Sequence, residues 1–118
     1  MFERLPQSEG KVYGVKVSET ITHEDYQGFI PQLEELIAKY GKIRVVYEME
    51  AVLGFTPKAA WDDIKFDWKH SKDIERCAVV GDKKWEKWMT NISKPFFPGE
   101  IKYFPLEDAA KAWAWVKE

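Results

Sequence analysis

The sequence predicts an α/β domain with the element order ββαβαβαβα, built on a mostly parallel sheet with helices on both faces. Short segments rich in β-branched and aromatic residues alternate with longer segments whose apolar residues recur every three or four positions. Strands that are separated by helices generally pair in parallel through right-handed crossovers. The length of 118 residues fits one such domain over residues 1–118, without a visible linker or internal repeat.

The chain opens with two predicted strands and a helix. Residues 11–19 alternate apolar and polar side chains, which is typical of a strand, and residues 1–5 are expected to pair with it as an antiparallel edge. Thr22 followed by Asp25 resembles a capping box and predicts the start of a helix. Gly41 is expected to end that helix, and Pro31 within it predicts a kink or a loosened first half.

The rest of the chain alternates strand and helix. Strands are expected over 42–50, 74–81 and 101–104, and helices from Thr56 onward, from Asp82 to Ile92 and from Leu106 to Glu118.

The helix that begins at Thr56 has a strong start signal. A Thr hydroxyl can cap the first turn, and Pro57 suits the first helical position. Its inner face is predicted from the spacing of Trp61, Ile64 and Trp68. Phe66 then falls on the opposite side, which predicts an exposed contact residue.

Composition limits the class of partner. The 18 Lys and Arg residues nearly balance the 20 Asp and Glu residues, so the net charge of −2 argues against broad binding to nucleic acid.

A single cysteine, Cys77, cannot form an internal disulfide. The first residues do not resemble a signal peptide, and no apolar run approaches the roughly 20 residues of a membrane span. We therefore expect a cytoplasmic protein.

Three acidic residues are the best candidates for a catalytic or metal site. Glu48 and Glu50 share one side of a predicted strand near its carboxyl end, and Asp82 ends the next strand. Ligands often bind at this edge of open α/β sheets. However, no His or Cys joins these acids at ligand spacing, so exposed strand-end acids and a helix cap are the favoured interpretation. We expect no metal and no cofactor.

The histidines and the thiol give no catalytic arrangement either. His23 lies in the first turn of one helix and His70 near the end of another, each without a nearby nucleophile. Cys77 lies within an apolar strand, where a buried thiol behaves as a small hydrophobe. The sequence therefore predicts a protein that is not an enzyme, with an enzyme built on the three acids as the least favoured alternative.

Several short motifs together resemble the SpoIIAA-like family, over about residues 11–116. The residues that carry the resemblance are Thr22-x-x-Asp25-Tyr26-x-x-Phe29-x-Pro31-x-Leu33-Glu34, Gly41-Lys42-Ile43-Arg44, Val80-Gly81-Asp82-x-x-Trp85-Glu86-x-Trp88 and Ala112-x-Ala114-Trp115-Val116. The resemblance implies a fold similar to STAS domains and to the lipid-binding CRAL-TRIO domain. It also implies hydrophobic ligand binding or membrane association as expected functions.

One position departs from the STAS pattern. STAS antagonists carry a phosphorylatable Ser at the start of the helix that follows the third strand, and residues 50–57 contain no Ser. Thr56 is the nearby hydroxyl. A helix cap is its favoured role, and a phosphorylation site is the alternative.

The aromatic residues suggest a binding role. Trp85, Trp88 and Met89 lie on one stripe of the helix that follows Asp82, and Phe96 and Phe97 come after it. Such a stripe fits either a sheet-covering helix or, with the neighbouring lysines, a membrane-surface helix or a lid over an apolar pocket.

Two functions follow as expectations. The leading one is a binding domain for a small hydrophobic or lipid-like ligand, with peripheral membrane association as an added expectation. Its pocket walls are expected from Trp61, Trp85, Trp88, Met89, Phe96 and Phe97. The alternative is a STAS-type interaction module that acts through a protein partner or as a homodimer, with Phe66 at the contact.

Overall fold

The computed structural model describes residues 1–82, 84–93 and 98–118. Within these ranges, nine side chains are not described: those of Ala51, Asp67, Trp68, Ser71, Trp85, Trp88, Met89, Ile92 and Ser93.

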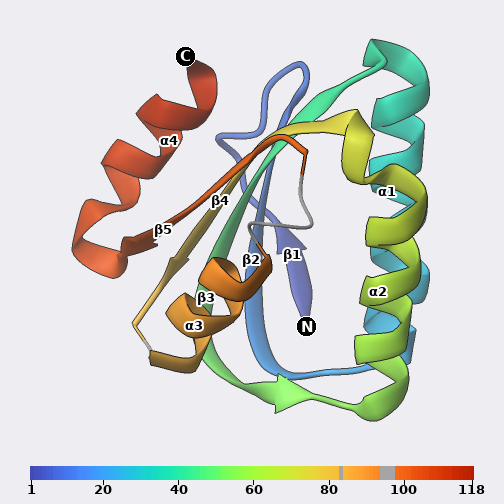
Figure 1. The fold of residues 1–118 in the computed structure, drawn as a ribbon, viewed down its shortest axis with the longest axis vertical. Helices are drawn as coiled ribbons and strands as arrows, with labels where there is room; N and C mark the ends of the chain where they lie inside the picture. The colour runs from blue at the N-terminus through green and yellow to red at the C-terminus, as the bar shows by residue number, and fades with distance from the viewer. Residues whose placement is uncertain (83, 94–97) are drawn as a thin grey trace.

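The described elements follow the predicted order (Figure 1). The strands are β1 (Phe2–Arg4), β2 (Val12–Ile21), β3 (Ile43–Phe55), β4 (Ile74–Gly81) and β5 (Glu100–Pro105). The α-helices are α1 (His23–Tyr40), α2 (Pro57–His70), α3 (Lys84–Ser93) and α4 (Ala109–Lys117). Two short 3₁₀ turns, η1 (Ser71–Asp73) and η3 (Leu106–Asp108), precede β4 and α4.

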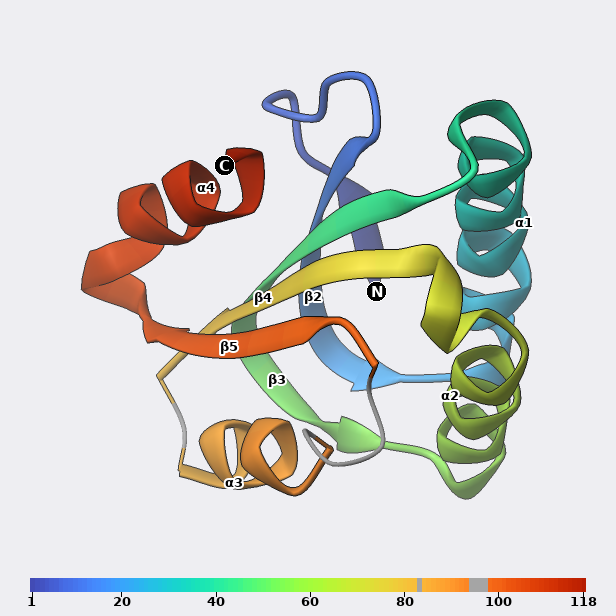
Figure 2. The same ribbon diagram turned by 45° about the horizontal axis from the view of Figure 1, so that its top comes forward.

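The five strands form one sheet in the order β1-β2-β3-β4-β5. β1 pairs antiparallel with β2, and the other three pairings are parallel. α1 and α2 cover one face of the sheet and α4 covers the other (Figures 1 and 2). α3 packs near β4 and β5. The predicted fold class and the antiparallel edge strand are therefore confirmed.

The sheet separates two apolar cores. In β3, Val45 belongs to the core beneath α1 and α2, while its neighbour Val46 belongs to the core beneath α4. This follows from the alternation of side chains along a strand. Both residues are fully buried, which explains why the β3 sequence is apolar on both faces.

β3 extends five residues beyond the predicted end at Glu50. The extension pairs with the last part of β2, where Val52 lies opposite Glu19 and Phe55 opposite Ile21. Pairing between strands, and not local apolar alternation, thus determines where β3 ends. As a result β2 and β3 finish together, and the two helices that follow them begin at the same edge of the sheet (Figure 2).

α1 runs through Pro31 without a break. Phe29 and Leu33 on either side of the proline remain buried in the core. Gly41 ends the helix with a φ of 81°, and its N–H donates to the Ile37 carbonyl at 2.7 Å. This left-handed conformation favours glycine, as the sequence predicts.

Candidate functional site

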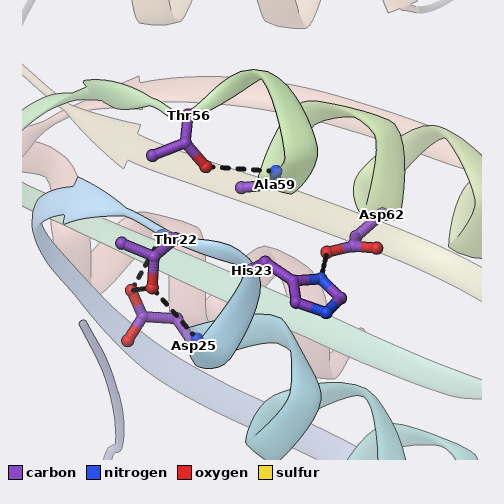
Figure 3. Close-up of polar contacts among 6 residues, drawn as sticks. All are labelled: Thr22, His23, Asp25, Thr56, Ala59 and Asp62. Carbon is purple, nitrogen blue, oxygen red and sulfur yellow. Dashed lines mark hydrogen bonds and ion pairs between the residues drawn. The ribbon is translucent and has the colours of Figure 1, made fainter.

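The starts of α1 and α2 lie next to each other (Figure 3). At the start of α1, Thr22 and Asp25 form the predicted capping box. The Asp25 N–H donates to Thr22 Oγ1 at 3.2 Å, and the Thr22 N–H donates to Asp25 Oδ2 at 2.9 Å. Burial raises the pKa of Asp25, but these hydrogen bonds and the nearby N-terminal amine outweigh burial and lower it.

Thr56 caps α2. Its Oγ1 accepts a hydrogen bond from the Ala59 N–H at 3.2 Å (Figure 3). The cap interpretation is therefore confirmed, and the alternative role as a phosphorylation site stays a prediction. The cap therefore places the first turn of α2 directly after β3.

α1 and α2 contact each other through polar side chains at this end. His23 Nδ1 is paired with the Asp62 carboxylate, which is 7% exposed (Figure 3). One position along, the Tyr26 hydroxyl donates to Asp63 Oδ1 at 3.1 Å. Burial raises the pKa of Asp63, and the Tyr26 hydrogen bond opposes this effect. Asp62 and Asp63 are thus both paired with residues of α1.

The far end of α2 contacts α1 through the second histidine. His70 Nε2 lies 3.1 Å from Glu34 Oε2, and its Nδ1 lies 3.0 Å from Asp73 Oδ2. The hydrogen bond from His70 and the nearby Lys69 hold the pKa of Glu34 below its usual value. Both histidines of the chain therefore bridge α1 and α2 through carboxylate partners.

The predicted orientation of α2 is wrong. Trp61 and Ile64, expected on the inner face, are 58% and 53% exposed, whereas Phe66, expected outside, is 7% exposed. Among the described side chains of α2, the buried ones are Ala59, Asp62 and Phe66, at the i, i+3, i+7 spacing of one helix face. The prediction assumed that the apolar residues mark the inner face of the helix. Asp62 faces inward instead, because His23 of α1 pairs with its carboxylate.

The outer side of α2 therefore presents a mixed surface, which we call the α2 face: Lys58, Trp61, Ile64 and Lys65. All four side chains are exposed. Phe66 is not available for the contact that the sequence predicted for it. Trp68 lies one turn after Ile64 on the same helix, and its side chain lies outside the described residues.

Two of the three candidate acids pair through their carboxylates, each with a different element, and the third is bonded through its backbone N–H. Glu48 Oε2 accepts from Trp113 Nε1 of α4 at 2.8 Å, and Glu50 pairs with Lys16 at 3.2 Å. The Asp82 N–H donates to Glu86 at 3.2 Å. Within the described part of the chain, no group of three His, Cys, Asp or Glu side chains is placed to hold a metal ion.

The aromatic helix is described only in part. α3 forms where the sequence predicts a helix, but the side chains of Trp85, Trp88 and Met89 lie outside the described residues, as do Phe96 and Phe97 entirely. The predicted apolar pocket beneath α3 therefore stays a prediction. Trp61, assigned to its wall, is on the exposed side of α2.

One feature of α3, a buried carboxylate, is not predicted from the sequence. Glu86 is 2% exposed, and its Oε1 accepts the Asp82 N–H. Burial raises the pKa of nearby Tyr103, and the carboxylates of Glu86 and Asp82 raise it further. A charged residue at this position is readily taken as exposed. In the structure the glycine at position 81 leaves room for the Glu86 side chain, because a Cβ there would lie 2.2 Å from Glu86 Oε1.

Comparisons with known proteins agree with this fold. A family model described as SpoIIAA-like matches residues 12–117. A crystal structure of an uncharacterized protein from Shewanella loihica PV-4, of the DUF3478 family with a SpoIIAA-like fold, superposes with a TM-score of 0.82. The two chains are 30% identical, and the alignment covers 98% of this chain and 92% of the other. No protein with a curated description matches.

The comparisons support the SpoIIAA-like part of the resemblance, and the likeness to CRAL-TRIO domains stays a prediction. None of the helices in the described ranges combines the length and the apolar character needed to cross a bilayer.

Proposed function

Because this chain belongs to the SpoIIAA-like family, we propose that it is a regulatory module that acts by binding another protein, without catalysing a reaction itself. The SpoIIAA-like, STAS-type fold suggests a regulatory or interaction role. The proposal places the contact on α2, the helix whose start corresponds to the regulated position of STAS antagonists.

The exposure of Trp61 and Ile64 carries the proposal. A Trp and an Ile that are both more than half exposed, one turn apart on the same helix, form an apolar surface that the fold itself does not use. Aromatic side chains of this kind are enriched at the centres of protein interfaces. A protein partner would remove this apolar area from water.

The alternative is a small hydrophobic or lipid-like ligand. It fits the structure less well, because Trp61 points away from the core in which a pocket would lie. The acids proposed for an enzyme are engaged elsewhere: Glu48 with Trp113, and Glu50 with Lys16. Binding to a protein is therefore the function that the described geometry favours.

Site-specific photo-crosslinking in the native cell tests the proposal. A photoreactive amino acid at Lys65 should capture one defined protein, and the same group at Lys111 on the exposed side of α4 should not. Adding Trp61→Ser should abolish the adduct without lowering the midpoint of urea unfolding, because Trp61 is exposed. The captured protein, purified, should bind the domain directly in calorimetry.

Two results would contradict the proposal. One is the absence of a Trp61-dependent adduct at Lys65. The other is a co-purifying lipid, seen by native mass spectrometry after incubation with cell lipid extract, whose loss of binding follows substitutions on α3 and not on α2. An adduct with a second copy of the chain would assign the interaction to a homodimer.

A further inference from the structure

We propose that the α2 face (Lys58, Trp61, Ile64 and Lys65) receives an acidic, amphipathic segment of the partner protein. This inference rests on the proposed function and names the chemistry of the partner. It follows from three properties of the α2 face: its geometry, its uncompensated charge and its width.

The four side chains form one continuous strip. Lys58, Trp61 and Lys65 have the i, i+3, i+7 spacing that places residues along one line of a helix, and Ile64 lies beside them. At a rise of about 1.5 Å per residue the strip is roughly 10 Å long, which is two helical turns. Lys69, also exposed, continues it by one more turn.

Within the described part of the chain, no acidic side chain pairs with Lys58 or Lys65 of the strip. Asp62 and Asp63 on the same helix are turned toward α1, where they contact His23 and Tyr26. Among the described residues, neither Lys58 nor Lys65 makes an ion pair, while Lys69 is paired with Glu34 at 3.3 Å. Electrostatic complementarity therefore calls for carboxylates on the partner.

The width of the strip favours a peptide segment over a membrane. The lysines of the strip all lie on α2, and the adjacent helix α1 exposes Glu24 and Glu35 together with a single lysine, Lys39. A flat anionic bilayer that touched α2 would also approach these carboxylates, which it would repel. In addition, one side of α2 is buried against the protein, so only the outer side could contact a membrane. A membrane-surface helix needs a broad apolar face and basic flanks on both sides.

A second copy of the chain is disfavoured as the partner because of the positive charge of the α2 face. In a twofold dimer each α2 face would contact the identical face of its partner, which places lysines against lysines. An extended or helical segment with apolar residues and Asp or Glu at helical spacing fits the strip, since its apolar residues cover Trp61 and Ile64 while its carboxylates meet the lysines.

Titration with synthetic peptides tests the inference. The probe is a 16-residue helical peptide with Leu on one face and Glu beside it, and the comparison peptide has Lys in place of every Glu. Amide chemical shifts of the full chain, recorded at low salt, should change along residues 57–70 with the Glu peptide only. Vesicles of phosphatidylcholine with phosphatidylglycerol provide the membrane arm and should cause no such change.

Charge reversal supplies the decisive variant. Lys58→Glu combined with Lys65→Glu should weaken binding of the Glu peptide tenfold or more, whereas Lys39→Glu combined with Lys42→Glu changes the net charge equally and should have little effect. Unfolding midpoints should show that both double variants remain folded. Equal weakening by both variants, preference for the Lys peptide, or binding to vesicles in place of the peptide would overturn the inference.

The two proposals fail differently. If crosslinking at Lys65 captures a partner whose contacting segment is basic or uncharged, the interaction role stands and the acidic segment is wrong. If crosslinking captures no partner there, the interaction role itself fails.

Discussion

Asp62 and Asp63 occupy the side of α2 that contacts α1, where apolar residues are the usual occupants. A buried carboxylate is tolerated only when hydrogen-bond donors replace its water. His23 and Tyr26 are those donors, and both come from the first turns of α1. The orientation of α2 thus depends on two polar contacts with residues more than thirty positions earlier in the chain.

Asp63 gives the first prediction. Burial raises the pKa of Asp63, so the folded state binds its proton more tightly than the unfolded chain does. Its contribution to stability is complete below the unfolded pKa, about 3.9, and is lost as pH rises through the folded pKa. Asp63→Asn keeps the oxygen that Tyr26 contacts but carries no titrating proton. The free energy of unfolding of this variant, measured relative to wild type, should therefore be higher at pH 7 than at pH 4.

The measurement is urea unfolding of wild type and Asp63→Asn at pH 4 and pH 7. Tyr26→Phe provides the control, because it removes the hydrogen bond that opposes the pKa rise. An Asn variant that loses stability equally at both pH values would contradict the assignment.

Thr56 gives the second prediction. Loss of its cap in Thr56→Ala should cost about 1 kcal/mol of unfolding free energy, because the Ala59 N–H loses its acceptor. Thr56→Ser and Thr56→Asp retain an acceptor and should stay close to wild type. Chemical denaturation of the three variants checks this, and equal losses in Ala and Ser variants would rule out the cap as the source of stability.

At the scale of elements, α2 has two sides that both mix apolar and polar residues. The inner side carries an acidic residue and the outer side carries lysines. Its buried stripe contains Ala59, Asp62 and Phe66, and its outer strip contains Trp61 and Ile64. Apolar content alone does not separate the two sides, because each holds large apolar residues. The polar partners on α1 separate them.

This division predicts opposite outcomes for two aromatic substitutions. Phe66→Ala should lower the free energy of unfolding by about 3 kcal/mol through loss of core contacts. Trp61→Ala should change it by less than about 0.5 kcal/mol, as exposed positions usually do. Urea unfolding followed by far-ultraviolet circular dichroism measures both, and a larger loss for Trp61→Ala would mean that Trp61, not Phe66, faces the core.

α4 is joined to the sheet by a close approach at Gly14. A Cβ at this position would lie 2.2 Å from the Trp113 ring, whose Nε1 donates to Glu48. Gly14→Ala should therefore displace the indole and cost about 2 kcal/mol, the usual cost of overpacking. Trp113→Leu should relieve part of this loss when the two changes are combined.

Gly28→Ala is the matched control for Gly14→Ala. A Cβ at Gly28 meets no atom within 4 Å, and the residue lies inside α1, where Ala is more favourable than Gly by about 0.5–1 kcal/mol. This variant should be at least as stable as wild type. Comparable destabilisation at both glycines would show that contact with Trp113 is not the cause.

For the whole molecule, ion pairs join elements that lie far apart in the sequence. Lys11 donates to Glu75 at 2.9 Å across 64 residues of sequence, and His70 contacts Glu34 across 36. Hydrogen bonds from Lys11 and from His70 hold the pKa values of Glu75 and Glu34 below their usual range. Depressed carboxyl pKa values stabilise the fold above the unfolded pKa, about 4.3, and this stability is lost as pH falls through the folded values.

Acid unfolding tests this account. Glu34→Gln with Glu75→Gln should lower stability at pH 7 and flatten its decline between neutral and acid pH, by well under 1 kcal/mol for each such partly exposed pair. Glu35→Gln is the control, since Glu35 is exposed beside Glu34 and makes no ion pair among the described residues. An unchanged acid limb in the double variant would exclude these two carboxyls as its source.

Much of the fold could be predicted from the sequence because its signals are local. The capping box at Thr22, the glycine at Gly41 and the Thr56-Pro57 start depend on neighbouring residues alone, and all three operate as expected. The strand β4 likewise has the predicted bounds, Ile74–Gly81. Hydrophobic periodicity and capping are properties of short segments, so they survive in any tertiary setting that buries the apolar stripe.

Only the tertiary structure determined which side of α2 is buried and how far β3 extends. Asp62 faces inward because His23 lies opposite it, and β3 continues to Phe55 because β2 offers a partner at Ile21. Both depend on residues distant in sequence, whose contacts no local pattern encodes. The sequence therefore defined an α/β domain and its elements, and the packing of α2 on α1 determined that Trp61 and Ile64, with their lysines, face outward.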